Sequence, residues 1–171
     1  NPYGSNTFKK LLNDFFFFFI LSDNKKFKLF VTATNVLNAQ LKIFTGKELT
    51  VEALMASACI PLLSQTVEIE GELYWDGAYI GNPSLFPLIN DCESSDIIVI
   101  LVIPHQIAKP PISAKDIKWR MQELFHTNAL VREMRAIDFV TNLIDQKAVK
   151  DLNLKKVNMH VIEDSLYFSQ I

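Results

Sequence analysis

The fold of this chain is decided by one stretch, Tyr74-Trp75-Asp76-Gly77-Ala78-Tyr79-Ile80-Gly81-Asn82-Pro83. Two apolar runs meet here at an Asp-Gly pair, and a second turn of small residues follows. A glycine after a strand can adopt a positive φ angle, so the backbone can hold the preceding aspartate in a fixed orientation. The stretch therefore indicates that the carboxylate of Asp76 is presented to a cleft. The same pattern is typical of a β-hairpin turn, which is the structural alternative.

The size and composition fit a soluble globular protein with one domain over residues 1–171. Hydrophobic residues make up 49% of the chain and charged residues 21%, and this length suffices for a sizeable core. The net charge of −2 gives no overall electrostatic attraction for nucleic acid or an anionic membrane. His105, His126 and His160 have no metal-ligand spacing, so no metal site is predicted. Cys59 and Cys92 are expected to be free thiols in a reducing compartment, with a disulfide as the alternative.

The beginning of the chain shows neither an initiator methionine nor a signal peptide. We therefore expect a part of a longer, cytoplasmic protein. Thr7 to Asp14 has the pattern of a short amphipathic helix. The apolar run from Phe15 to Leu21, which opens with the five phenylalanines Phe15–Phe19, is too short to span a bilayer, because a spanning helix needs about 20 apolar residues. It is predicted to pack in the core, with a lipid-facing or lid element as the alternative.

Runs of β-branched and aromatic residues predict six strands. They are Phe27–Thr34, Gln40–Phe44, Gln65–Ile69, Leu73–Trp75, Asp96–Ile103 and Val157–Glu163. The third and fourth form a hairpin across Glu70-Gly71. The run Asp96–Ile103 is almost entirely apolar, which is typical of a central strand buried on both faces.

Three further segments have helical patterns: Val51–Ala58, Ser84–Asn90 and the segment from Ser113 to about Lys150. Thr50 is the predicted N-cap of the first, whose small residues allow close packing against a neighbour. The long third segment carries an apolar stripe of the kind that packs on a sheet, with a dimer seam as the alternative. Strands mixed with covering helices predict a layered α/β domain.

Spacing patterns do not reveal a complete catalytic site. A serine hydrolase of the α/β type places its nucleophile in a GxSxG elbow, and these 171 residues contain no such motif. The five glycines are isolated from one another, so there is no phosphate-binding loop. Residue patterns alone therefore lead to an α/β domain with one notable aspartate, Asp76.

Four blocks of sequence carry a resemblance to a known family. They are Ala33-Thr34-Asn35-Val36, Lys42-Ile43-Phe44, Ala56-Ser57-Ala58-Cys59-Ile60-Pro61 and Asp76-Gly77-Ala78-Tyr79 with Asn82-Pro83. Their order and spacing resemble the C-terminal half of a bacterial patatin-like phospholipase. Residues 128–145 are also similar to bacterial members.

The resemblance implies a three-layer α/β/α sandwich and the hydrolysis of lipid acyl esters by a Ser–Asp dyad. Asp76 matches the aspartate of the dyad, while Gly77 and Ala78 match the rest of its motif, and Asn82 has a supporting role. In the family the serine elbow and the glycine-rich oxyanion loop lie upstream of these blocks. The resemblance thus implies a C-terminal part of the hydrolase domain that lacks the strands carrying the nucleophile.

The implied partners are a lipid or phospholipid substrate and the upstream segment that carries the serine. No metal, organic cofactor or nucleic acid is implied, and contact with membrane surfaces is transient and peripheral. One alternative from a different functional class is a non-catalytic lipid-binding or interaction module that kept the fold without the nucleophile. A further alternative is a structural fragment that is unstable without its upstream strands.

Overall fold

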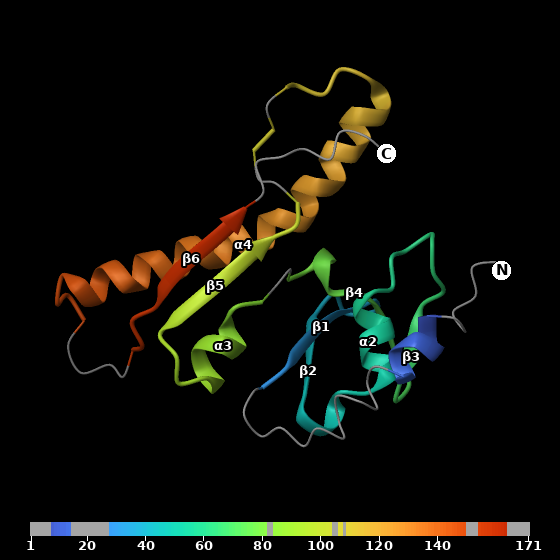
Figure 1. The fold of residues 1–171 in the computed structure, drawn as a ribbon, viewed down its shortest axis with the longest axis horizontal. Coiled ribbons are helices and arrows are strands. Elements are labelled where there is room, and N and C mark those ends of the chain that lie inside the picture. Colours follow the sequence, from blue (N-terminus) through green and yellow to red (C-terminus); the bar gives the residue numbers. More distant parts are fainter. Residues whose placement is uncertain are drawn as a thin grey trace. The chain divides into compact units, whose positions relative to one another are not determined.

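The computed structural model describes residues 8–14, 28–81, 84–103, 106–107, 109–149 and 154–163. The chain divides into two compact units, Asn1–Pro83 and Ser84–Ile171. Each unit has its own sheet (Figure 1). Each also has its own buried cluster of apolar residues. The predicted mixed α/β architecture is confirmed, and it is consistent with a patatin-like fold. One domain over residues 1–171 stays a prediction.

The first unit is built on a four-stranded antiparallel sheet with the order β2-β1-β4-β3. Its strands are β1 (Phe30–Asn35), β2 (Leu41–Thr45), β3 (Val67–Ile69) and β4 (Glu72–Asp76). A short 3-10 turn, η1 (Gly46–Glu48), follows β2. Strand β1 pairs with both β2 and β4, and its register with β4 places Ala33 opposite Asp76. The sheet thus brings the end of β1 beside the predicted site residue Asp76.

The hairpin between β3 and β4 confirms the predicted turn at Glu70-Gly71. Both residues have positive φ angles, +52° and +81°. A two-residue loop with two positive φ angles matches the right-handed twist of the strands that it joins. This turn fixes the register of β4, because Ile69 then pairs with Glu72 and Val67 with Tyr74.

Helix α2 (Val51–Ser57) packs on this sheet as its small residues predicted. The Thr50 side chain accepts a hydrogen bond from the Ala53 amide at 3.2 Å and caps the helix. Ala53 and Ala56 are completely buried. They belong to one apolar cluster whose other buried members are Ala33, Phe44 and Tyr74.

The second unit contains a two-stranded parallel sheet and a long helix. Its elements are α3 (Phe86–Asp91), β5 (Asp96–Leu101), α4 (Ala114–Asp145) and β6 (Asn158–Glu163). Strand β5 pairs with β6 in register from Asp96↔Asn158 to Leu101↔Glu163. The buried cluster joins α4 to these strands through Leu130, Ile137, Ile97 and Val99.

Strand β5 differs from its prediction. Ile97 and Val99 are buried, but Ile98 and Ile100 are 63% and 68% exposed. Successive side chains of a strand point to opposite faces, and the α4 cluster holds only one of those faces. Among the described residues, the prediction of a strand buried on both faces is therefore wrong.

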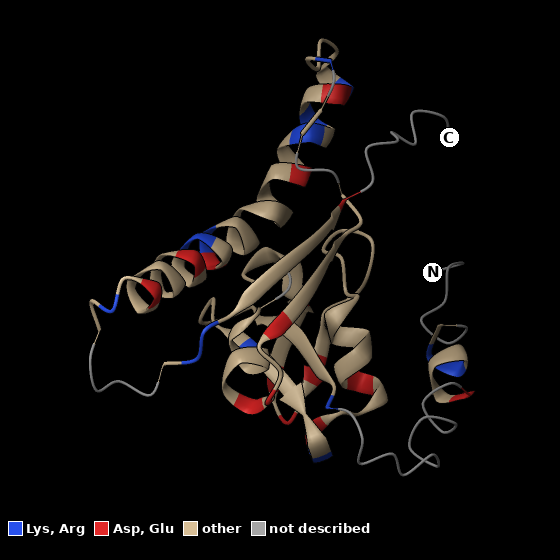
Figure 2. Ribbon diagram, turned by 60° about the vertical axis from the view of Figure 1, so that its left-hand side comes forward, with Lys and Arg blue, Asp and Glu red and all other residues tan. Residues whose placement is uncertain are grey.

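Helix α4 is also only partly covered. Leu130 and Ile137 in its C-terminal half are buried, whereas Ile117, Met121 and Phe125 in its N-terminal half are exposed. Figures 1 and 2 both show the helix bent near its middle. The prediction of an apolar stripe packed on a sheet holds for the second half of α4 and is wrong for the first half.

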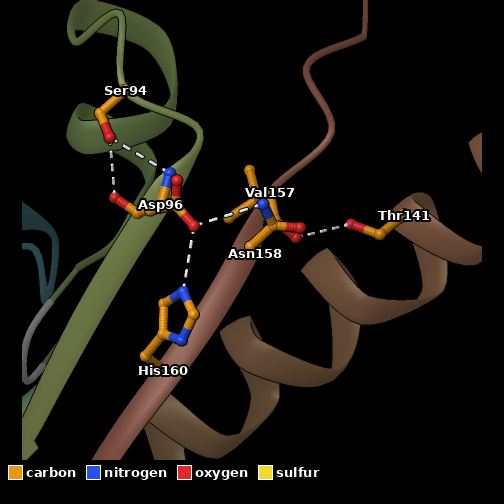
Figure 3. Close-up of polar contacts among 6 residues, drawn as sticks. All are labelled: Ser94, Asp96, Thr141, Val157, Asn158 and His160. Carbon is orange, nitrogen blue, oxygen red and sulfur yellow. Dashed lines mark hydrogen bonds and ion pairs between the residues drawn. The ribbon is translucent and has the colours of Figure 1, made fainter.

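A polar cluster joins the beginnings of β5 and β6 (Figure 3). One Asp96 side-chain oxygen, Oδ1, lies 3.0 Å from His160 Nε2 and 3.3 Å from Asn158 Nδ2. Hydrogen bonds from His160 and then Asn158 hold the pKa of Asp96 below its ordinary value. The side chains are exposed, so solvent screens this pair and it contributes little to stability.

Residues 8–14 are helical, as predicted. Lys9 in this segment forms an ion pair of 2.9 Å with Glu52 of α2. The run from Phe15 to Leu21 lies outside the described residues. None of the described helices is both long and apolar enough to cross a membrane.

Candidate functional site

Asp76 is the last residue of β4, and its backbone is held on both sides. Its amide donates a hydrogen bond of 2.9 Å to the Cys59 carbonyl, just beyond α2. Its own carbonyl accepts a hydrogen bond of 2.8 Å from the hydroxyl of Thr34 on β1. Thr34 is only 5% exposed, so little solvent competes for this bond. Contacts from two other elements therefore fix the backbone of Asp76.

The Asp76 side chain is fixed as well. Its Oδ1 accepts a hydrogen bond of 2.9 Å from the Ala78 amide and caps the 3-10 turn η2 (Gly77–Tyr79). Within the described part of the chain, the other carboxylate oxygen accepts no hydrogen bond. The chain continues into η2 rather than into a returning strand, so the hairpin alternative is wrong. The arrangement presents one oriented, unoccupied carboxylate oxygen.

Gly77 is required for a different reason from the one predicted. Its φ angle is not positive, in contrast to Gly46 and Gly71. A Cβ atom at Gly77 would instead lie 2.5 Å from the Thr32 carbonyl oxygen, and closer still to the Thr32 hydroxyl. No real Cβ atom approaches backbone so closely. Gly77 therefore allows the turn after Asp76 to lie against β1.

Cys59 lies close enough to Asp76 for the charge of Asp76 to affect the pKa of the Cys59 thiol. The thiol is 2% exposed and donates a hydrogen bond to the Gln65 carbonyl with an Sγ–O distance of 3.1 Å. Burial, with a smaller contribution from the negative charge of Asp76, raises the pKa of the Cys59 thiol. A buried thiol with a raised pKa is a poor nucleophile. Cys59 and Cys92 are both free thiols, as predicted.

The structure brings together three of the four predicted site residues, Asp76, Gly77 and Ala78. Asn82 lies outside the described residues, so its supporting role stays a prediction. Thr34 was part of a family block but had no predicted role, and only the register of β1 with β4 reveals its contact with Asp76. No pattern within either strand could have indicated that contact.

Two other features lie apart from these residues in the chain. A cavity of about 270 Å³ in the second unit lies among α4 and the ends of β5 and β6, with Leu130 and Met134 in its wall. It contains none of the predicted site residues. Among the described residues, no cluster of His, Cys, Asp and Glu is suited to a metal ion.

Comparison with known proteins gives one family match. The model of the patatin-like phospholipase family matches residues 3–89, which is just over half of the chain. The matched range contains β1 to β4, α2 and the whole of η2. No curated protein matches the chain.

Proposed function

The chain belongs to the patatin-like phospholipase family, and on this premise we propose that it carries the catalytic aspartate of a bacterial lipid acyl-ester hydrolase. Asp76 is the general base of a Ser–Asp dyad. The serine, in its GxSxG elbow, lies on a segment upstream of these 171 residues. Gly77 and Ala78 form the turn that supports Asp76, and Asn82 has a supporting role.

The chemistry follows from a carboxylate that acts without a histidine. The free oxygen of Asp76 accepts the proton of the serine hydroxyl as the serine oxygen attacks the ester carbonyl carbon. Asp76 then returns this proton to the departing alcohol, leaving an acyl-serine. Water hydrolyses the acyl-serine by the same route, with Asp76 again accepting and returning one proton. No metal or organic cofactor takes part in the proposed cycle.

The observation that carries the proposal is that the two carboxylate oxygens of Asp76 differ in their hydrogen bonding. Oδ1 is held by the Ala78 amide, while the second oxygen accepts no hydrogen bond from any described residue. A base must lie within hydrogen-bond reach of its proton in a defined orientation. The bonds to Thr34 and Cys59 supply that orientation through the backbone.

The substrate class is a lipid or phospholipid ester. The protein is proposed to be cytoplasmic and to contact membrane surfaces transiently while it takes up substrate.

Asp76→Asn in the full-length protein tests the proposal. The asparagine oxygen can still accept the Ala78 amide hydrogen, so we expect an unchanged melting temperature within a few degrees. The amide nitrogen cannot accept a proton, so kcat on a short-chain p-nitrophenyl ester should fall by roughly 10²–10⁴-fold. Hydrolysis near the wild-type rate by the folded variant would end the assignment of Asp76.

The second candidate function is a non-catalytic lipid-binding module, favoured by the lack of a GxSxG motif in these 171 residues. It differs from the first in its outcome: the wild-type full-length protein would bind vesicles but release no fatty acid from them. Release of fatty acid that depends on Asp76 excludes this alternative.

A further inference from the structure

The N-terminal half of α4 carries an exposed apolar stripe. We define the α4 stripe as Ile117, Met121, Leu124 and Phe125. At about 100° per residue, the four side chains fall within an arc of about 100° on one side of the helix. All four are exposed, with exposed fractions from 40% to 64%. The spacing is that of one helical face, and it extends over about two and a half turns.

This stripe is not a continuation of the face that packs on the sheet. The buried residues Leu130 and Ile137 lie roughly 160–180° around the helix from Met121. The strands β5 and β6 pack against the side on which Leu130 and Ile137 lie. The stripe therefore faces away from the strands that cover the rest of α4.

The acidic residues of α4 and three of its basic residues lie on different sides of the helix relative to the stripe. The arc of about 120° that contains the stripe also contains Lys118, Arg132 and Arg135, all exposed. The same arc contains no acidic residue. All five acidic residues of the helix lie on the remaining side: Asp116, Glu123, Glu133, Asp138 and Asp145. Within the described part of the chain, none of the three cations forms an ion pair. Figure 2 shows the basic and acidic residues distributed along this helix.

We propose that this face of α4 docks on an anionic lipid surface, with the α4 stripe inserted among the acyl chains and the three cations at the headgroups. An apolar helical face bordered by Lys and Arg is the pattern of helices that lie in a membrane interface. Each basic residue near an anionic surface contributes through attraction to the lipid headgroups. The choice of lipid as occupant rests on the proposed hydrolase function.

A second copy of the chain fits the stripe less well. A stable protein interface buries about 800 Å² on each partner and uses 20–30 residues a side. Four side chains on one helix do not reach that size. In an isologous dimer, moreover, the unpaired cations beside the stripe would be brought toward one another.

The test measures binding of the full chain to vesicles by co-sedimentation. One set of vesicles contains phosphatidylcholine and phosphatidylglycerol, and the other phosphatidylcholine alone. The stripe variant is Met121→Ser with Phe125→Ser, both at exposed positions where folding tolerates polar residues. We expect it to lower the partition coefficient on the anionic vesicles by roughly tenfold or more.

One control matches the stripe variant. Trp119→Ser changes an exposed aromatic residue in the same half of α4 but roughly 160° around the helix from Met121. This control should bind vesicles like the unaltered chain. A loss equal to that of the stripe variant would overturn the proposal.

The charge component has its own variant, Arg132→Gln with Arg135→Gln. It should weaken binding to phosphatidylglycerol vesicles by at least tenfold, remove most of the salt dependence, and leave the weaker binding to phosphatidylcholine unchanged. Unaltered binding by both the stripe and arginine variants would overturn the proposal. It would also be overturned if the chain were dimeric in sedimentation velocity and the stripe variant became monomeric without losing vesicle binding.

Failure of docking and failure of the proposed function can be told apart. Hydrolysis of a water-soluble short-chain ester by the full-length protein requires Asp76 but no lipid surface, so the stripe variant should keep its kcat there. If Asp76→Asn remains active while vesicle binding depends on the stripe, the hydrolase assignment fails and docking stands. If the dyad is confirmed but the stripe variant still binds vesicles, only the docking proposal fails.

Discussion

Replacing Thr34 with valine tests how far the backbone of Asp76 must be held for catalysis. Valine has nearly the same shape but cannot donate the 2.8 Å hydrogen bond to the Asp76 carbonyl. Thr34 is 5% exposed, so no bulk water replaces the lost donor. A buried acceptor that loses its partner costs about 1–2 kcal/mol, which for a chain of this size lowers Tm by roughly 3–6 °C.

The effect on activity distinguishes positioning from simple stability. If Thr34 positions Asp76, Thr34→Val in the full-length protein should lower kcat by about tenfold with little change in KM, because a small displacement of the base weakens proton transfer. Thr34→Ser keeps the hydroxyl and loses a buried methyl group, at about 1 kcal/mol of stability. The serine variant should therefore melt almost as early as the valine variant and yet keep its kcat.

A matched control comes from the second unit. Thr127 is also buried, but its hydroxyl donates to the Glu123 carbonyl within its own helix at 3.1 Å. Thr127→Val should leave kcat unchanged. The reasoning about Thr34 is refuted if its valine and serine variants lose kcat equally, or if both keep the wild-type value.

Two further predictions concern stability. Gly77→Ala should lower the free energy of unfolding by about 2–3 kcal/mol, because its Cβ would meet the Thr32 backbone. The control Gly46→Ala, at φ +55° with open space around it, should lower the free energy of unfolding by only about 1 kcal/mol. Equal losses in urea melts would contradict this account of Gly77. Asp96 has a lowered pKa in the folded chain, so its bonds to His160 and Asn158 stabilise the fold above the ordinary aspartate pKa and are lost as pH falls through the lowered value (Figure 3). The Tm difference between the wild type and Asp96→Asn should therefore be small and fully present above about pH 4. It should shrink as the pH falls from there through the lowered pKa of Asp96. A difference that grows toward lower pH would show the sign to be wrong.

Local features of the fold were predictable because they depend on neighbouring residues. Thr50 caps α2, Glu70-Gly71 turns between β3 and β4, and small residues let α2 approach its sheet. Each of these follows from a pattern a few residues long. The predicted strands and helices were found for the same reason, with ends displaced by a few residues.

Which faces of β5 and α4 are buried was not predictable in the same way. The apolar run of β5 contains no alternation that would mark Ile98 and Ile100 as exposed. The apolar residues of α4 likewise give no sign of which side of the helix the strands cover. What covers a face depends on elements distant in the chain, and the pattern of the face itself does not record them.

The candidate site likewise has features that follow from local sequence and features that depend on distant elements. The sequence by itself determined that Asp76 ends a strand and precedes a turn, because a strand pattern stops there at an Asp-Gly pair. Only the tertiary structure decided that Thr34, 42 residues earlier, binds the Asp76 carbonyl and that Thr32 leaves room for nothing larger than glycine at position 77. The physical reason is strand register. Pairing of β1 with β4 brings these residues together, and register depends on the whole sheet rather than on any one stretch.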